Sequence, residues 1–85
     1  MTRLRTTQAC DLLDVAFDIG PDLISTNTVE VTVLNKTVME AREDIDGYLA
    51  SLSYDIDEHS IFLKPDHVDG ADMPAVSITI MTEGV

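Results

Sequence analysis

The sequence predicts an α+β domain built as a two-layer sandwich, with two helices packed on one face of a small three- to four-stranded mixed or antiparallel sheet. Two segments carry apolar residues at the helical period, and two other segments alternate β-branched and polar residues as strands do. The chain has 85 residues, which predicts a single domain, 1–85, whose core is one sheet and one helical layer. The expected order of elements is α-β-α-β-β-β.

The first helix is expected over residues 8–18. Its apolar residues recur at i, i+3, i+4, i+7 and i+8 and so share one face: Ala9, Leu12, Leu13, Ala16 and Phe17. The side-chain oxygen of Thr6 or Thr7 is expected to cap the first turn. Gly20 and Pro21 are expected to end the helix, because Gly tolerates the left-handed cap and Pro lacks an N–H.

The next two elements are a strand over 28–34 and a second helix that ends near Leu52. The strand alternates Val with other residues, and Asn35 and Lys36 make the turn after it. Thr37 and Glu40 have the spacing of a capping box, which predicts that the helix begins there. The buried stripe of this helix is expected to be Val38, Ala41, Ile45, Tyr48, Leu49 and Leu52.

The last third of the chain is expected to form strands. Alternation predicts a short strand at 54–56, a turn at 57–60 and a second short strand at 61–64, which together would make a hairpin. An acidic loop is expected at 65–74, and the strongest strand pattern in the chain lies at 75–82.

One face of the sheet is expected to meet water, with four polar residues pointing outward: Glu30, Thr32, Ser77 and Thr79. Leu34 and Met81 are apolar exceptions on that face. A homodimer through this face or through a sheet edge is expected, since a small core and exposed edges both favour association. The alternative is a monomer, which the strong net charge favours.

Charge is the most unusual feature of the composition. Sixteen acidic residues oppose five basic ones, for a formal net charge of −11. Such a chain repels nucleic acid and anionic membranes, so neither is expected to bind it directly, and it attracts basic protein surfaces. Asp outnumbers Glu eleven to five and Lys occurs twice, a bias that is also found in proteins adapted to high salt.

The acidic residues gather on the predicted outer faces of the helices. Asp11, Asp14 and Asp18 are three and four residues apart, which on a helix gives a row spaced by about 4.5 and 6 Å. The second helix would add Glu40, Glu43 and Asp44. If the helices lie side by side, these six carboxylates form one acidic surface, and they are the predicted partner-binding residues. A secondary candidate is the acidic loop, with Asp66, Asp69 and Asp72.

No motif predicts an enzyme, a metal or a cofactor. The densest polar segment contains carboxylates and the two histidines, His59 and His67, but its spacing matches neither a calcium loop nor a zinc site. Cys10 could act as a nucleophile with a histidine as base, yet no oxyanion loop or third orienting residue accompanies it. We therefore expect the histidines and the carboxylates near them to be solvated turn residues, and Cys10 to be a small side chain of the core.

In size, charge and acidic helix faces the chain resembles small acidic anti-defence proteins of phages and mobile elements, a class that includes anti-CRISPR proteins and nucleic-acid mimics. The class has no shared fold, so no residue is carried over from it. The resemblance implies inhibition by occupying a basic, nucleic-acid-binding groove of a partner such as a host defence complex. We therefore expect a non-enzymatic, cytoplasmic binding module. The alternative is a small domain of a salt-adapted organism, whose acidity serves solubility.

Overall fold

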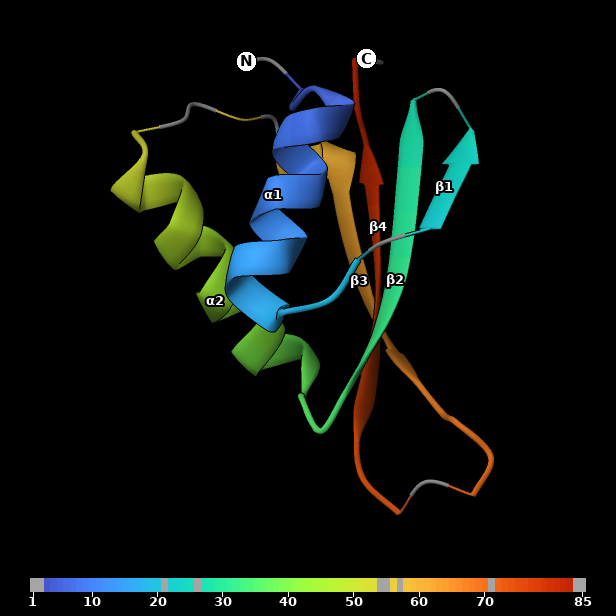
Figure 1. Ribbon diagram of the computed structural model, residues 1–85. Helices are drawn as coiled ribbons and strands as arrows, with labels where there is room; N and C mark the ends of the chain where they lie inside the picture. The colour runs from blue at the N-terminus through green and yellow to red at the C-terminus, as the bar shows by residue number, and fades with distance from the viewer. Residues whose placement is uncertain are drawn as a thin grey trace.

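A computed structural model describes residues 3–20, 22–25, 27–53, 56, 58–70 and 72–83. Its helices are α1 (Thr6–Phe17) and α2 (Val38–Ser51), with a short 3₁₀ turn, η1 (Glu58–Ser60). Its strands are β1 (Asp22–Ser25), β2 (Thr28–Leu34), β3 (Ile61–Asp66) and β4 (Ala75–Met81). Both helices lie on one side of the sheet (Figure 1), so the expected α+β fold with its helices on one sheet face is confirmed.

The sheet is antiparallel throughout, in the order β1-β2-β4-β3. Central β4 pairs with β2 on one side and β3 on the other, so that Ile78 faces Val31 and Leu63 in register. Strands β2 and β3 both run opposite to β4 and are therefore parallel to each other. Helix α2 makes the long connection between them, which antiparallel neighbours would not need.

Two strand predictions need correction. The sequence pattern gave no strand at Asp22–Ser25, but β1 lies there and pairs with β2, with an irregular register between Leu23 and Ser25. A strand of four residues is too short to show alternation, which explains why the pattern missed it. Of the predicted strand at 54–56, only Ile56 is described, and it makes an isolated bridge; residues 54 and 55 lie outside the described part of the chain.

The core fills the space between the helices and the sheet. Leu12 and Leu13 of α1 and Ala41 and Ile45 of α2 are fully buried. They meet a cluster of strand residues that includes Val29, Val31, Ile61, Val76, Ile78 and Ile80. Burying each large aliphatic side chain contributes roughly 1.5–3 kcal/mol, so these periodic positions carry most of the stability of the fold.

The ends of α1 differ from the prediction. Thr6 does not cap the helix but is its first residue and is buried, while Arg5 takes the cap position and donates its backbone N–H to Gln8 Oε1 over 2.8 Å. The helix ends before Gly20, because Asp18 itself adopts the left-handed conformation, with φ 54°. In the described part of the chain, neither helix has the length and apolar character of a membrane span.

The sheet face away from the helices is also less solvated than expected at its centre. Ser77 was expected to face water, but it is buried, since β4 is a central strand with neighbours on both sides. Thr32 and Lys64 stand beside Ser77 in register and cover it. Leu34, near the end of β2, is exposed as predicted.

Candidate acidic interface

The outer face of α1 carries the most regular set of unshielded carboxylates. Asp11 and Asp14 are exposed, whereas Ala9, Leu12 and Leu13 on the opposite face have no exposed surface. The helical period accounts for both faces, because packing the apolar stripe against the core leaves Asp11 and Asp14 pointing outward. The predicted orientation of this row is therefore confirmed.

Asp18 continues the acidic row beyond the end of the helix. It is exposed, and its backbone N–H donates to the carbonyl of Asp14 over 2.8 Å. Its left-handed backbone directs the chain away from the helix axis, so the regular spacing expected for three carboxylates holds for Asp11 and Asp14 and is interrupted at Asp18. The acidic surface of α1 is thus a helical pair with a third carboxylate at the C-cap.

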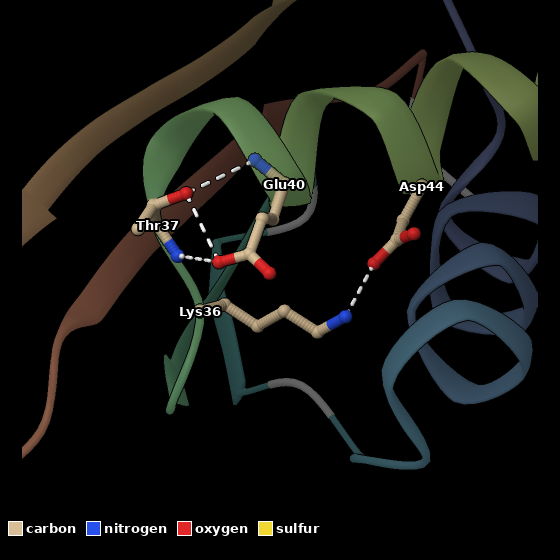
Figure 2. A network of polar contacts seen from close by, with 4 residues as sticks. All are labelled: Lys36, Thr37, Glu40 and Asp44. Atoms are coloured by element: carbon tan, nitrogen blue, oxygen red, sulfur yellow. Dashed lines mark hydrogen bonds and ion pairs between the residues drawn. The ribbon is translucent and has the colours of Figure 1, made fainter.

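Two of the three carboxylates predicted on α2 make contacts within the chain (Figure 2). Glu40 Oε1 accepts hydrogen bonds from the backbone N–H and the hydroxyl of Thr37, each over 3.1 Å, and the Thr37 hydroxyl accepts from Glu40 N–H. This is the predicted capping box, which fixes the first turn of α2. Asp44 Oδ2 lies 2.8 Å from Lys36 Nζ in an ion pair.

The Lys36–Asp44 pair partly neutralises this end of α2. The hydrogen bond and the charge of Asp44, with a further contribution from Glu40, raise the pKa of the Lys36 ammonium above its ordinary value, although desolvation opposes the shift. Lys36 precedes the helix and its side chain runs along the helix to Asp44, so it neutralises one carboxylate of this face. Glu40 and Asp44 are therefore poorer contacts for a partner than the carboxylates of α1.

Glu43 and Asp46 are the better exposed carboxylates on α2. Both residues are exposed. The sequence analysis missed Asp46, although it lies one residue after Ile45 and five after Ala41, a spacing that turns it away from the buried stripe of the helix. Each helix also exposes an apolar side chain, Met39 of α2 at 72% and Val15 of α1 at 68%, so the two outer faces differ in their basic residues. Arg42, half-buried, adds a positive charge. The helical layer thus carries its most uniform negative charge on α1.

The secondary candidate, the acidic loop, lies at the end of the β3–β4 hairpin, away from both helices (Figure 1). Asp66 belongs to β3 rather than to the loop, and its Oδ1 accepts a hydrogen bond from the backbone N–H of His67. His67 Nε2 lies 3.8 Å from Asp69 Oδ1, with both side chains largely in water. Asp72 is exposed. These carboxylates are accessible but are not joined to the α1 row.

Two chemical roles, a metal site and a reactive cysteine, can be compared with the described residues. No group of three or more His, Cys, Asp or Glu side chains among them is arranged to hold a metal ion. Cys10 lies half-buried against the core, on the flank of the apolar stripe. Its surroundings are those of a small apolar side chain.

Comparisons of the chain with protein-family models, with curated proteins and with solved structures gave no significant match.

Proposed function

We propose that the protein is a non-enzymatic binding module whose α1 carboxylates dock on a basic, nucleic-acid-binding surface of a partner protein. The observation that supports this proposal is the outward pair of Asp11 and Asp14, followed by Asp18 at the C-cap, on a helix whose opposite face buries Ala9, Leu12 and Leu13. A firmly packed helix presents charge at fixed positions, which reduces the conformational entropy lost on binding.

The chemistry of the partner follows from the charge. Asp11 and Asp14 are about 4.5 Å apart along the helix axis, a spacing of the same order as that of phosphates along a nucleic-acid strand. A groove of Lys and Arg side chains that binds a phosphate backbone would therefore attract this helix, and a host defence complex is one protein of that kind. Such partners act in the cytoplasm, which is the location that the proposal implies.

Two triple variants test the proposal, because they remove equal charge from different places. One carries Asp11→Asn, Asp14→Asn and Asp18→Asn on α1, and the other carries Asp66→Asn, Asp69→Asn and Asp72→Asn at the hairpin end. Both variants and the wild type would be immobilised and exposed to host lysate, with and without competing DNA. We expect wild type and the hairpin variant to retain nucleic-acid-binding proteins that DNA releases.

The α1 variant should associate with a retained partner about tenfold more slowly at low salt, since several exposed charges together steer association. Single substitutions should be nearly silent, because one exposed charge contributes about 0–1 kcal/mol. Equal loss of binding in both triple variants would mean that net charge alone attracts the partner, and would contradict a specific role for α1. Retained proteins that competing DNA does not release would contradict the proposed partner chemistry.

A further inference from the structure

The sheet has one face without a covering layer. Both helices lie on the opposite side, and no described segment crosses the outer face of β2, β4 and β3 (Figure 1). Apolar side chains are exposed on it: Phe62 of β3 is 52% exposed and Leu34 of β2 is 47% exposed. Met81 of β4, half-buried, belongs to the same face, since it pairs with Thr28 in register.

Charge is distributed very unequally between the two sides. Helices α1 and α2 with the C-cap Asp18 carry seven acidic residues and one basic residue, a net −6. The outward register positions of the four strands carry Asp22, Glu30, Asp66 and Lys64, a net −2, since Asp22 of β1 pairs with Glu30. The remaining outward positions of β2, β4 and β3 are apolar or hydroxyl-bearing. A protein of net charge −11 therefore keeps this face weakly charged compared with the helical layer.

We infer that this open sheet face binds a second copy of the chain, giving a two-fold dimer in which the two sheets pack face to face and the helices point outward. This inference does not rest on the proposed function. A second copy has the same large negative charge, and only this approach brings two weakly charged faces together while the acidic helices stay far apart.

The sheet edges are poorly suited to the alternative, edge-to-edge pairing. The outer strand β3 contains Pro65, which has no N–H to donate to an added strand. The other outer strand, β1, has four residues and an irregular register with β2. Short, irregular or proline-containing edges are the usual protection against strand addition. Of the two expected ways to form a dimer, the structure therefore favours the open face over a sheet edge.

The size of the open face sets the expected stability of the dimer. With strands ~4.8 Å apart and a rise of ~3.4 Å per residue, four strands of up to seven residues span roughly 20 × 24 Å. Because β1 and β3 are shorter than seven residues, covering the face on two copies removes at most about 1,000 Å² of accessible surface, which is below the ~1,200–2,000 Å² of stable specific interfaces and in the range of weak ones. The dimer should therefore be reversible and depend on protein concentration.

Sedimentation equilibrium over a range of concentrations tests the inference. The wild type should pass from its 9.3 kDa monomer mass to twice that mass as concentration rises, and no further. Phe62→Glu should raise the dissociation constant about 30-fold or more, because it places a charge at the most exposed large apolar side chain of the open face. Met39→Glu is the matched control: it makes the same change at an exposed apolar residue of the helical layer and should leave the dissociation constant nearly unchanged.

Lys64→Glu is a second variant for the case in which Phe62→Glu does not fold. Lys64 is exposed, so its substitution should preserve the fold, but the reversed charge should weaken the dimer by repulsion. A wild type that remains monomeric at every concentration would overturn the inference. Equal weakening by Met39→Glu and Phe62→Glu would also overturn it, and so would growth into larger assemblies, which indicates pairing through edges.

Discussion

The hydroxyl oxygens of Thr6 and Thr82 lie 3.0 Å apart in the interior of the protein, although 76 positions separate them in the sequence. Both residues are buried. Thr6 opens α1 and Thr82 directly follows β4, so this contact joins the first helix to the last strand. A second link lies beside it, where the backbone N–H of Glu83 donates to the carbonyl of Leu4 over 2.8 Å. The two ends of the described chain thereby stabilise each other.

The Thr6–Thr82 contact predicts a coupled loss of stability. Thr82→Val keeps the shape of the side chain but removes one hydroxyl, and should lower the free energy of unfolding by about 1 kcal/mol. Thr6→Val together with Thr82→Val should cost less than the sum of the single variants, since they share one interaction. Urea denaturation measures both effects. Thr7→Val is the control, an exposed threonine in the same turn, and should change stability by less than about 0.5 kcal/mol. If the losses in free energy of unfolding of the two single variants add up to that of the double variant, the coupling is contradicted.

The Lys36–Asp44 ion pair predicts a dependence of stability on alkaline pH. The pair raises the pKa of Lys36 in the folded protein, so its stabilisation is fully present below the pKa of Lys36 in the unfolded chain and is lost as pH rises through the higher folded value. Asp44→Asn should therefore lower Tm slightly near neutral pH, and this difference from wild type should disappear at strongly alkaline pH.

Asp46→Asn is the matched control for that experiment. It removes the same charge from an exposed position two residues along α2. Because it relieves repulsion without breaking the ion pair, it should leave Tm unchanged or raise it near neutral pH. A similar fall in Tm for both variants would show that the Lys36–Asp44 pair contributes nothing specific.

Asp18 predicts an increase in stability on substitution. Its backbone is left-handed, with φ 54°, and its negative charge lies at the C-terminal end of the α1 dipole. Asp18→Gly should stabilise the protein by about 1 kcal/mol, because glycine adopts this conformation without a steric penalty. Asp18→Asn should gain about 0.3–1 kcal/mol from the charge alone. Thermal unfolding followed by circular dichroism measures both variants, and a loss of stability in Asp18→Gly would contradict the cap geometry.

The sequence predicted the parts of the fold that repeat a local pattern. The stripe of Leu12 and Leu13 and the capping box of Thr37 and Glu40 each lie within one or two helical turns, so spacing alone reveals them. What it missed depends on contacts distant in the sequence. Leu4 is buried only because the end of β4 lies beside it, and β1 exists only because β2 supplies its hydrogen-bonding partner.

The candidate interface likewise combines features that local spacing predicts with features that depend on the three-dimensional path of the chain. The exposure of Asp11 and Asp14 follows from helical periodicity and was predictable. The ion pair of Asp44 was not, because Lys36 belongs to the turn before α2 and only the three-dimensional path of that turn brings its side chain to the helix. The open sheet face required strand order, since the central position of β4 decides that Ser77 is buried while Phe62 on outer β3 stays exposed.

The dependence of folding on salt separates the proposed binding module from a salt-adapted domain. A net charge of −11 repels itself, and salt screens that repulsion over about 10 Å at 0.1 M. A salt-adapted domain should be largely unfolded in dilute buffer and should fold at molar salt. The binding module should be folded in dilute buffer, because its core and its buried Thr6–Thr82 contact do not depend on screening. Circular dichroism in both conditions measures this directly.

The two triple variants extend the test from folding to binding. Each removes three negative charges, so both should gain stability at low salt if self-repulsion is general, and the α1 variant should gain more because it includes Asp18→Asn at the C-terminal end of the helix dipole. Only the α1 variant should lose association with a basic partner, and the advantage of wild type over it should shrink as salt rises. A wild type that needs molar salt to fold would favour salt adaptation over the proposed function. A folded wild type whose α1 variant binds as fast as its hairpin variant would leave α1 as a solvated helix face, and the exposed Glu43 and Asp46 of α2 would then be the next residues to substitute.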